Sequence, residues 1–163
     1  GQGMNEFTPL QLANYVATLV NGGSHYACHL LKECKSSDYS RATEIYDEEP
    51  LDTIHIQPEH LAAVKQGMYD LSKTWSIARY FDSLPVEVGC KTGTAETSAK
   101  AASTNAVFVC FAPYDDPQVA LCLVAEGGDA GGSLAELAAG ILAQYFSTDS
   151  SLSTVATENT LLR

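Results

Sequence analysis

The chain has 163 residues, the length of one ordinary domain; 45% of them are hydrophobic and 18% are charged, so it can bury a core and is not disordered. Nine lysines and arginines against twenty aspartates and glutamates give a formal charge of −11, which disfavours nucleic acid as a partner. The longest apolar runs, 106–113 and 119–125, are much too short to cross a membrane, and no signal peptide is recognisable.

The first predicted helix begins immediately after Thr8. Thr8 can cap the exposed backbone amides, Pro9 suits the first helical position, and Gln11 can complete a capping box. Asn21 and the glycine pair 22–23 are expected to end this helix. The start of the chain therefore contains a complete set of helix signals.

Three further helical segments follow. A helix begins at Pro58, a short helical turn is expected over 76–81, and a last helix is expected from Ser133, as its cap, to about Phe146. Residues that recur at helical spacing are assigned to the apolar faces of the three longer helices. They are Leu12, Tyr15, Val16 and Leu19; Leu61, Val64, Met68 and Leu71; and Leu134, Leu137, Ala138, Ile141 and Leu142.

Extended segments or strands are expected at 25–34, 42–46, 86–95, 104–112 and 118–125. The turn residues 113–117 predict that the last two strands form a hairpin, and their nearly continuous apolar character predicts a sheet covered on both faces. We therefore expect one α/β domain of the α+β type over residues 1–147, with helices packed on the faces of an antiparallel sheet. A polar, disordered tail is expected over 148–163.

The cysteines and histidines indicate neither a disulfide framework nor a metal site. The five cysteines are odd in number and contain no Cys-x-x-Cys pair. Cys110 and Cys122 lie in apolar runs, where a thiol usually serves as a small buried hydrophobe. His25 and His29 fall in a stretch predicted to be extended, and the four histidines form no plausible ligand set. No metal or other cofactor is expected.

The stretch from Lys91 to Thr94 is the candidate for chemistry, because it lies at the end of the buried strand predicted over 86–95 and a predicted hairpin follows it. A lysine fixed on a strand supplies a point charge beside a nucleophile or a carboxylate, and Gly93 lets a substrate lie against the strand edge. The hydroxyls of Thr92 and Thr94 point to one face and can hold a carboxylate, and a backbone amide there can donate to an oxyanion. The alternative is a purely structural role, with a solvated lysine at a turn and threonine filling a strand. Judged from the three-residue motif alone, this structural role is favoured over the catalytic one.

Lys-Thr-Gly is one of three signature motifs of penicillin-binding proteins and serine β-lactamases. Other short matches occur in the order found in class B penicillin-binding proteins: Gly-Gln-Gly (1–3), Thr-Pro-Leu-Gln-Leu-Ala (8–13), Asn-Gly-Gly (21–23), Gly-Met-Tyr (67–69), Tyr-Phe (80–81), Phe-Ala-Pro-Tyr (111–114), Asp-Pro-Gln-Val-Ala (116–120) and Glu-Gly-Gly (126–128). Over residues 1–147 the chain resembles the elongation-type transpeptidases of this class.

The resemblance implies both a fold and an activity. It implies that the chain is the C-terminal half of a mixed α/β transpeptidase domain, in a protein that cross-links peptidoglycan stem peptides through a serine acyl-enzyme and is acylated by β-lactams. Carried over by the motif, Lys91 and Thr94 are catalytic: Lys91 supports proton transfer and attracts the substrate carboxylate, and the Thr94 amide forms half of the oxyanion hole. Thr92, Gly93 and Thr94 bind the substrate.

Two other family motifs are missing. The nucleophile motif Ser-x-x-Lys is absent, because no serine has a lysine three positions later. Residues 97–100 have threonine in the serine position, and Ser103-Thr104-Asn105 matches Ser-x-Asn only by its letters; both follow Lys91, which is the wrong order for the family. The missing motifs belong to a half of the domain that would precede Gly1, so we expect the chain alone to be inactive. Directly before Lys91, where a small apolar residue is usual in the family, this chain has Cys90. Its thiol is either mildly activated by the neighbouring lysine or a buried packing residue.

Two interpretations of different classes remain open. The first is a transpeptidase fragment whose partners are stem peptides, β-lactams and the missing half of its domain; the second is a β-lactam sensor or a non-catalytic binding homologue. Residues 8–11 and 111–114 favour the enzyme, and a D,D-carboxypeptidase or β-lactamase ranks lower.

The resemblance places the whole protein on the outer face of the cell membrane. An uncovered sheet edge or apolar face predicts self-association or low stability of the chain alone.

Overall fold

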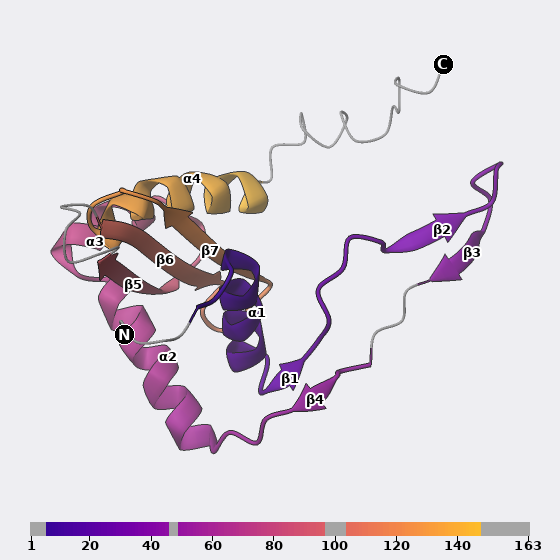
Figure 1. The fold of residues 1–163 in the computed structure, drawn as a ribbon, viewed down its shortest axis with the longest axis horizontal. Coiled ribbons are helices and arrows are strands. Elements are labelled where there is room, and N and C mark those ends of the chain that lie inside the picture. Colours follow the sequence, from indigo (N-terminus) through magenta and orange to yellow (C-terminus); the bar gives the residue numbers. More distant parts are fainter. Residues whose placement is uncertain (1–5, 46–48, 97–103, 148–163) are drawn as a thin grey trace.

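The computed structural model describes residues 6–45, 49–96 and 104–147. Figure 1 shows a body, in which helices pack around a three-stranded sheet, and an arm, residues 24–57 apart from the undescribed 46–48, that extends away from it. The elements are α1 (Pro9–Val20), β1 (Ser24–His25), β2 (Glu33–Lys35), β3 (Ala42–Ile45), β4 (Asp52–Thr53), α2 (Pro58–Ser72), α3 (Trp75–Phe81), β5 (Gly89–Glu96), β6 (Thr104–Ala112), β7 (Val119–Ala125), the 3-10 helix η1 (Gly131–Leu134) and α4 (Ala135–Phe146). The expected tail over 148–163 lies outside the described residues.

Helix α1 begins as the sequence predicts. Thr8 Oγ1 accepts a hydrogen bond from Gln11 N at 3.2 Å, and Gln11 Oε1 accepts one from Thr8 N at 2.8 Å, so the capping box is complete. Asn21 ends the helix. Val16 is buried on the inward face, whereas Tyr15, which was assigned to the same face, is 63% exposed.

The three long strands form an antiparallel sheet in the order β5-β6-β7. Pairing between β5 and β6 runs without a slip from Gly89 opposite Phe111 to Glu96 opposite Thr104, and β6 and β7 form the predicted hairpin. Residues 86–88, predicted to belong to the first of these strands, lie before it. Among the described strands, β5 and β7 each pair with β6 alone and are therefore the two edges of the sheet.

Both faces of β6 are covered, as its continuous apolar character predicts. On one face Phe108 belongs to a buried cluster with Leu142 of α4, and on the other Phe111 clusters with Val16 of α1 and Met68 of α2. Burying each large apolar side chain contributes about 1.5–3 kcal/mol. The central strand β6 is therefore packed on both faces. Strand β5 is held in place by its antiparallel pairing with β6.

The last helix begins later than expected, and Ser133 is not its cap. Ser133 lies inside η1, where its Oγ donates to Ala130 O at 2.7 Å. Helix α4 begins at Ala135 after Leu134, which forms no side-chain cap. A helical turn directly before α4 supplies the hydrogen bonds that a serine cap would otherwise provide, since 3-10 turns commonly start α-helices.

Helix α4 buries a narrower stripe than predicted. Ala138 and Leu142 are completely buried, but Leu137 and Ile141, also assigned to the inward face, are 55% and 38% exposed. Val64 of α2 is likewise 47% exposed. These apolar side chains therefore form part of the exposed surface of the two helices.

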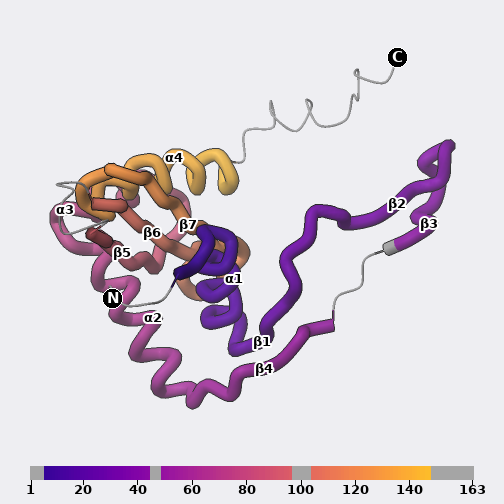
Figure 2. Tube along the Cα trace, in the orientation of Figure 1, coloured from indigo at the N-terminus to yellow at the C-terminus, as the bar shows by residue number. Residues whose placement is uncertain are grey.

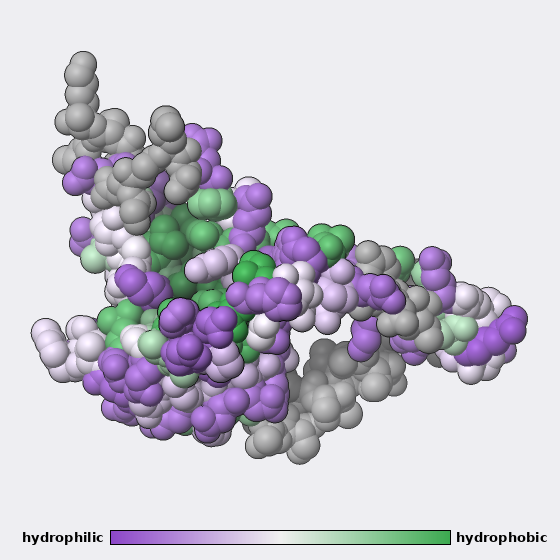
Figure 3. All heavy atoms as spheres, turned by 90° about the horizontal axis from the view of Figure 1, so that it is seen from below, coloured by the Kyte–Doolittle hydropathy of each residue, from purple (hydrophilic) through white to green (hydrophobic). Residues whose placement is uncertain are grey.

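The arm consists of two short antiparallel pairs, β1 with β4 and β2 with β3. Figure 2 traces the tube outward along β2 and back along β3, so the predicted extended stretch 25–34 connects the two pairs. Figure 3, seen from below, shows hydrophobic residues exposed among hydrophilic ones; Phe7, near the N-terminal end of the described chain, is 61% exposed, and Ile54 of the arm is 53% exposed. In the described part of the chain, no helix has the length and hydrophobicity required to cross a bilayer.

Candidate functional site

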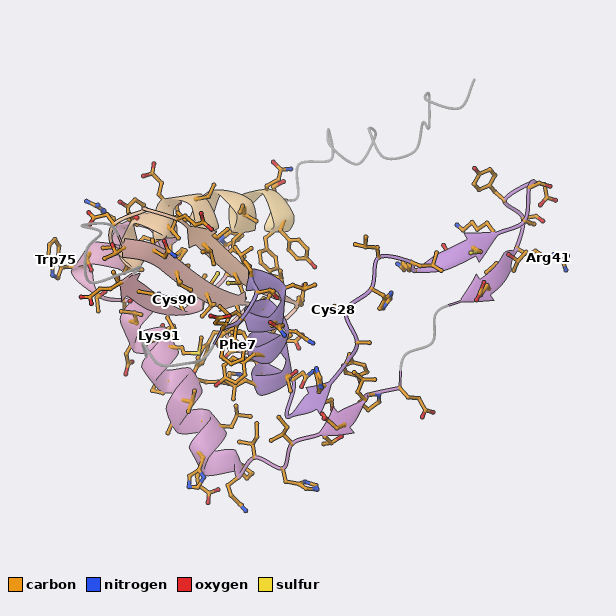
Figure 4. All side chains as sticks on the ribbon, in the orientation of Figure 1. Phe7, Cys28, Arg41, Trp75, Cys90 and Lys91 are labelled. Atoms are coloured by element: carbon orange, nitrogen blue, oxygen red, sulfur yellow. The ribbon has the colours of Figure 1, made fainter. Side chains whose placement is uncertain are left out.

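The Lys-Thr-Gly motif lies on the edge strand β5. Lys91 and Thr94 are exposed, whereas Thr92 and Gly93 are partly buried. Figure 4 shows Lys91 directly beside Cys90 on the body of the molecule, away from the arm. The motif is therefore displayed on the surface of a hydrogen-bonded strand and is not buried in the interior.

The start of β5 is anchored by close packing. Cys90 is completely buried and lies opposite the equally buried Cys110 of β6. At Gly89 an added Cβ would lie only 2.3 Å from Cε1 of the Phe111 ring, so no larger residue fits without displacing that ring. These contacts fix the strand immediately before Lys91. They therefore also fix the point at which the Lys91 side chain leaves the backbone.

The four motif residues divide between the two faces of β5. Thr92 and Thr94 share one face because side chains alternate along a strand, and Lys91 and Gly93 share the other. Lys91 Nζ donates to Thr92 O at 2.5 Å, and Thr94 Oγ1 accepts a hydrogen bond from Gly131 N at 3.2 Å. The two threonines were predicted to share a face, and the strand confirms this; the contact with Gly131 was not predicted.

Packing against the described residues does not require glycine at position 93. A Cβ added there would meet Val107 Cβ at 3.4 Å and Val107 O at 3.8 Å, which are ordinary contact distances. Its φ angle is not in the left-handed region that favours glycine, since Gly22, Gly23 and Gly127 are the described glycines with positive φ. A methyl group at position 93 would therefore fit against Val107 in the described part of the chain.

A second lysine supports the segment that enters β5. Lys73, at the end of α2, donates to Glu87 Oε2 and lies 5.0 Å from the centroid of the Tyr69 ring. The hydrogen bond with Glu87 raises the pKa of Lys73. Tyr114 N donates to Glu87 O at 2.9 Å, so α2 and the β6–β7 turn are both tied to this segment. An exposed ion pair of this kind contributes about 0.2–1 kcal/mol.

The thiol beside the motif is a packing residue rather than an activated group. Burial raises the pKa of Cys90 to about 12, and the Lys91 ammonium only partly offsets this rise. Burial also raises the pKa of Cys110, and Cys122 is partly buried. All five cysteines are free thiols. Over the described ranges, no group of three or more His, Cys, Asp or Glu side chains could hold a metal ion.

The described part of the Ser-x-Asn match, Thr104 and Asn105, belongs to a strand, as expected. Thr104 and Asn105 are the first two residues of β6, and Asn105 Oδ1 accepts a hydrogen bond from Gly127 N at 3.2 Å. Ser103 and residues 97–100 lie outside the described residues. The described part of this motif therefore has a structural role in holding the loop that follows β7.

The region from residue 1 to residue 143 matches the family model of the penicillin-binding protein transpeptidase domain. The chain belongs to this family. The match reaches from before α1 into α4 and includes the whole sheet, so it covers the strand that carries Lys91 and the elements that pack on it.

Named relatives agree with the family model. Peptidoglycan D,D-transpeptidase MrdA of Escherichia coli strain K12 is 31% identical over 157 residues, which cover 87% of this chain and 24% of that protein. A ceftriaxone acyl-enzyme complex of penicillin-binding protein A from Mycobacterium tuberculosis has a TM-score of 0.77 at 26% identity over 90% of this chain and 34% of that one. Pseudomonas aeruginosa PBP2 in complex with WCK 5153 has a TM-score of 0.70 at 26% identity over 91% of this chain and 33% of that one.

The comparisons confirm the predicted fold and the resemblance to elongation-type transpeptidases. The chain has the mixed α/β architecture of a penicillin-binding protein transpeptidase domain, with helices packed on an antiparallel sheet. It spans about a quarter of the length of the curated relative MrdA. The names of these relatives favour the transpeptidase interpretation over a sensor or a non-catalytic binding homologue.

Proposed function

We propose that residues 1–147 are the C-terminal half of the transpeptidase domain of a peptidoglycan D,D-transpeptidase. The full-length protein cross-links stem peptides through a serine acyl-enzyme and is acylated by β-lactams. The observation that carries the proposal is the exposure of Lys91 and Thr94 on an edge strand, within a chain that matches the transpeptidase family model. The serine comes from polypeptide outside this chain, because Ser-x-x-Lys does not occur in it.

Lys91 supplies the positive charge of the site. Its ammonium attracts the carboxylate at the end of the donor stem peptide and supports proton transfer near the serine. Lys91 Nζ donates one hydrogen bond to Thr92 O, and an ammonium with three protons can make further hydrogen bonds to a ligand at the same time. Thr92 and Thr94 hold the substrate carboxylate through their hydroxyls.

The backbone of β5 contributes the oxyanion donor. Along an edge strand, residues alternate between pointing both backbone polar groups at the neighbouring strand and pointing both outward. The bond from Lys91 Nζ to Thr92 O is consistent with Thr92 pointing outward, and the amide of Thr94, two residues on, then faces the same open edge. In this position the Thr94 amide forms half of the oxyanion hole.

Gly93 admits the substrate backbone. Among the described residues, the nearest atom to a Cβ added at Gly93 is Val107 Cβ at 3.4 Å, so the requirement for glycine comes from the ligand that lies against the strand. The edge of β5 then binds the stem peptide as an additional strand would bind it.

Some apolar side chains of this chain are left exposed to solvent. The missing half of the domain covers apolar side chains such as Leu137 and Ile141 of α4, and the chain alone self-associates through surfaces of this kind. The full-length protein acts on the outer face of the cell membrane, where peptidoglycan is assembled. The fragment by itself is inactive because it lacks the nucleophile.

The test is intact-mass spectrometry of the full-length protein after incubation with benzylpenicillin. The expected result is one covalent adduct of the mass of the drug, and no adduct on the 163-residue chain alone or on heat-unfolded full-length protein. A folded full-length protein that forms no adduct contradicts the proposal and leaves a non-catalytic homologue as the better description. Release of D-Ala with formation of a cross-linked product from stem peptides then separates a transpeptidase from a β-lactam sensor.

A further inference from the structure

The loop between β7 and α4 touches the strand that carries the motif. Within this loop, Gly131 is the first residue of η1 and is buried. From its contacts we infer that Gly131 is a positioning residue for Thr94, which sets the orientation of the threonine hydroxyl toward a ligand carboxylate. The inference rests on the proposed function, because it concerns how the same site recognises its substrate.

The contact that joins the two residues is a backbone-to-side-chain hydrogen bond. Gly131 N donates to Thr94 Oγ1 at 3.2 Å, across 37 positions of sequence. A hydroxyl can accept and donate hydrogen bonds at the same time, so the bond from Gly131 N fixes where Thr94 Oγ1 lies without preventing the hydroxyl from donating to a ligand. A carboxylate is an acceptor, and an orientation fixed in advance lowers the entropic cost of binding it.

Gly131 can make this contact only because it has no side chain. An added Cβ would lie 2.3 Å from Gly93 O, 2.5 Å from Val107 O and 2.9 Å from Gly93 N, all of them backbone atoms of β5 and β6. Backbone atoms of a paired strand cannot move aside as the end of a flexible side chain can. The neighbouring Gly132 differs, since its added Cβ would meet only Ile77 Cδ1 at 3.6 Å.

The loop is fixed at both sides of Gly131. Thr104 Oγ1 donates to Asp129 O at 2.7 Å, and Asn105 Oδ1 accepts from Gly127 N at 3.2 Å, so the start of β6 holds the loop before Gly131. Ala135 and Ala138 of α4 are completely buried and hold the chain after it. The amide of Gly131 is therefore a fixed donor and not a mobile one.

The first experiment compares Gly131→Ala with Gly132→Ala in the full-length protein. The rate constant of acylation is measured with benzylpenicillin, which carries the carboxylate, and with its methyl ester, which does not. We expect Gly131→Ala to reduce the preference for the free acid about tenfold, as for the loss of one hydrogen bond to a charged group, whereas Gly132→Ala retains it. Wild-type protein that is not acylated at all overturns the proposed function; normal acylation with an unchanged preference in Gly131→Ala overturns this inference alone.

A second experiment applies if Gly131→Ala does not fold. Hydrogen exchange at the segment 127–133 is followed in the full-length protein carrying Thr94→Val, which keeps the shape of threonine and removes its acceptor oxygen. We expect faster exchange of the Gly131 amide in Thr94→Val and wild-type protection in Thr94→Ser, which keeps the hydroxyl. Equal exchange in wild type and Thr94→Val contradicts the inference, because the hydroxyl then does not hold this amide.

Discussion

Cys90 and Cys110 lie directly opposite each other across β5 and β6, and neither side chain has any exposed surface. The next residue along β5, Lys91, is exposed. Within one residue the strand passes from the core to the surface, so buried packing sets the point at which the Lys91 side chain leaves the backbone.

The buried thiols predict a loss of stability at alkaline pH. Burial raises the pKa of Cys90 from its ordinary value of 9.0 to about 12, so between these values the thiol ionises in the unfolded chain but stays protonated in the native one. The free energy of unfolding therefore falls as the pH rises above 9.0 toward about 12, and the contribution of Cys90 is complete below this window. Urea unfolding across this range measures the slope, which is expected to be smaller in Cys90→Ala; equal slopes in the two proteins contradict the prediction.

The capping box at the start of α1 predicts a measurable loss on removal of one hydroxyl. Thr8→Ala removes the acceptor for Gln11 N and is expected to lower the free energy of unfolding by about 1 kcal/mol. Thr8→Ser keeps the acceptor and serves as the matched control, with a change of a few tenths of a kcal/mol at most. Urea denaturation of the three proteins gives the answer, and identical midpoints for Thr8→Ala and wild type refute it.

Local signals determined which parts of the fold could be predicted from the sequence. The cap at Thr8 and the strand over 104–112 depend on neighbouring residues, and both occur as predicted. The start of β5 was placed too early, because its pairing with β6 begins only at Gly89, opposite Phe111, and Glu87 O instead accepts a hydrogen bond from Tyr114 N in the turn after β6. Leu137 was placed in the core because helical spacing identifies an apolar stripe but does not show how much of it is covered.

The residues proposed for the site could be located from the sequence, whereas the contacts that hold them in place could not. Lys91 and its neighbours could be located from their letters and from the apolar strand before them. The contacts of Thr94 with Gly131 and of Lys73 with Glu87 join residues on separate elements, and nothing in the local sequence marks such pairs. They arise from the packing of α2 and η1 against the sheet, which the sequence pattern does not specify.

Gly93→Ala is expected to slow acylation while leaving the stability of the fold almost unchanged. Because the added Cβ meets Val107 at ordinary contact distances in the described part of the chain, the free energy of unfolding of the 163-residue chain is expected to change by no more than about 0.5 kcal/mol. In the full-length protein the acylation rate constant for benzylpenicillin is expected to fall about tenfold or more, because the Cβ occupies space that the ligand needs. A marked loss of stability, or an unchanged acylation rate constant, counts against the role of Gly93.

The exposed apolar residues of α4 predict self-association of the isolated chain. Sedimentation velocity is expected to show species larger than a monomer that increase with concentration, since Leu137 and Ile141 are exposed on one side of the helix. Leu137→Glu is expected to shift the distribution toward monomer. Gln144→Glu adds the same charge to this surface without removing an apolar group, and it is expected to have little effect; a monomer at all concentrations in the wild-type chain rules out the prediction.

The most direct test of the central claim is the acylation rate constant of the full-length protein carrying Lys91→Met, measured with benzylpenicillin by intact mass. Lys91 is exposed, so the variant is expected to retain the melting temperature of the wild type. Its acylation is expected to be slower by about a hundredfold or more, as for loss of a group that assists proton transfer. Lys35→Met, which removes an exposed lysine of the arm, is the control and is expected to react at the wild-type rate. Acylation of Lys91→Met at the wild-type rate would show that the ammonium on β5 does not serve the reaction.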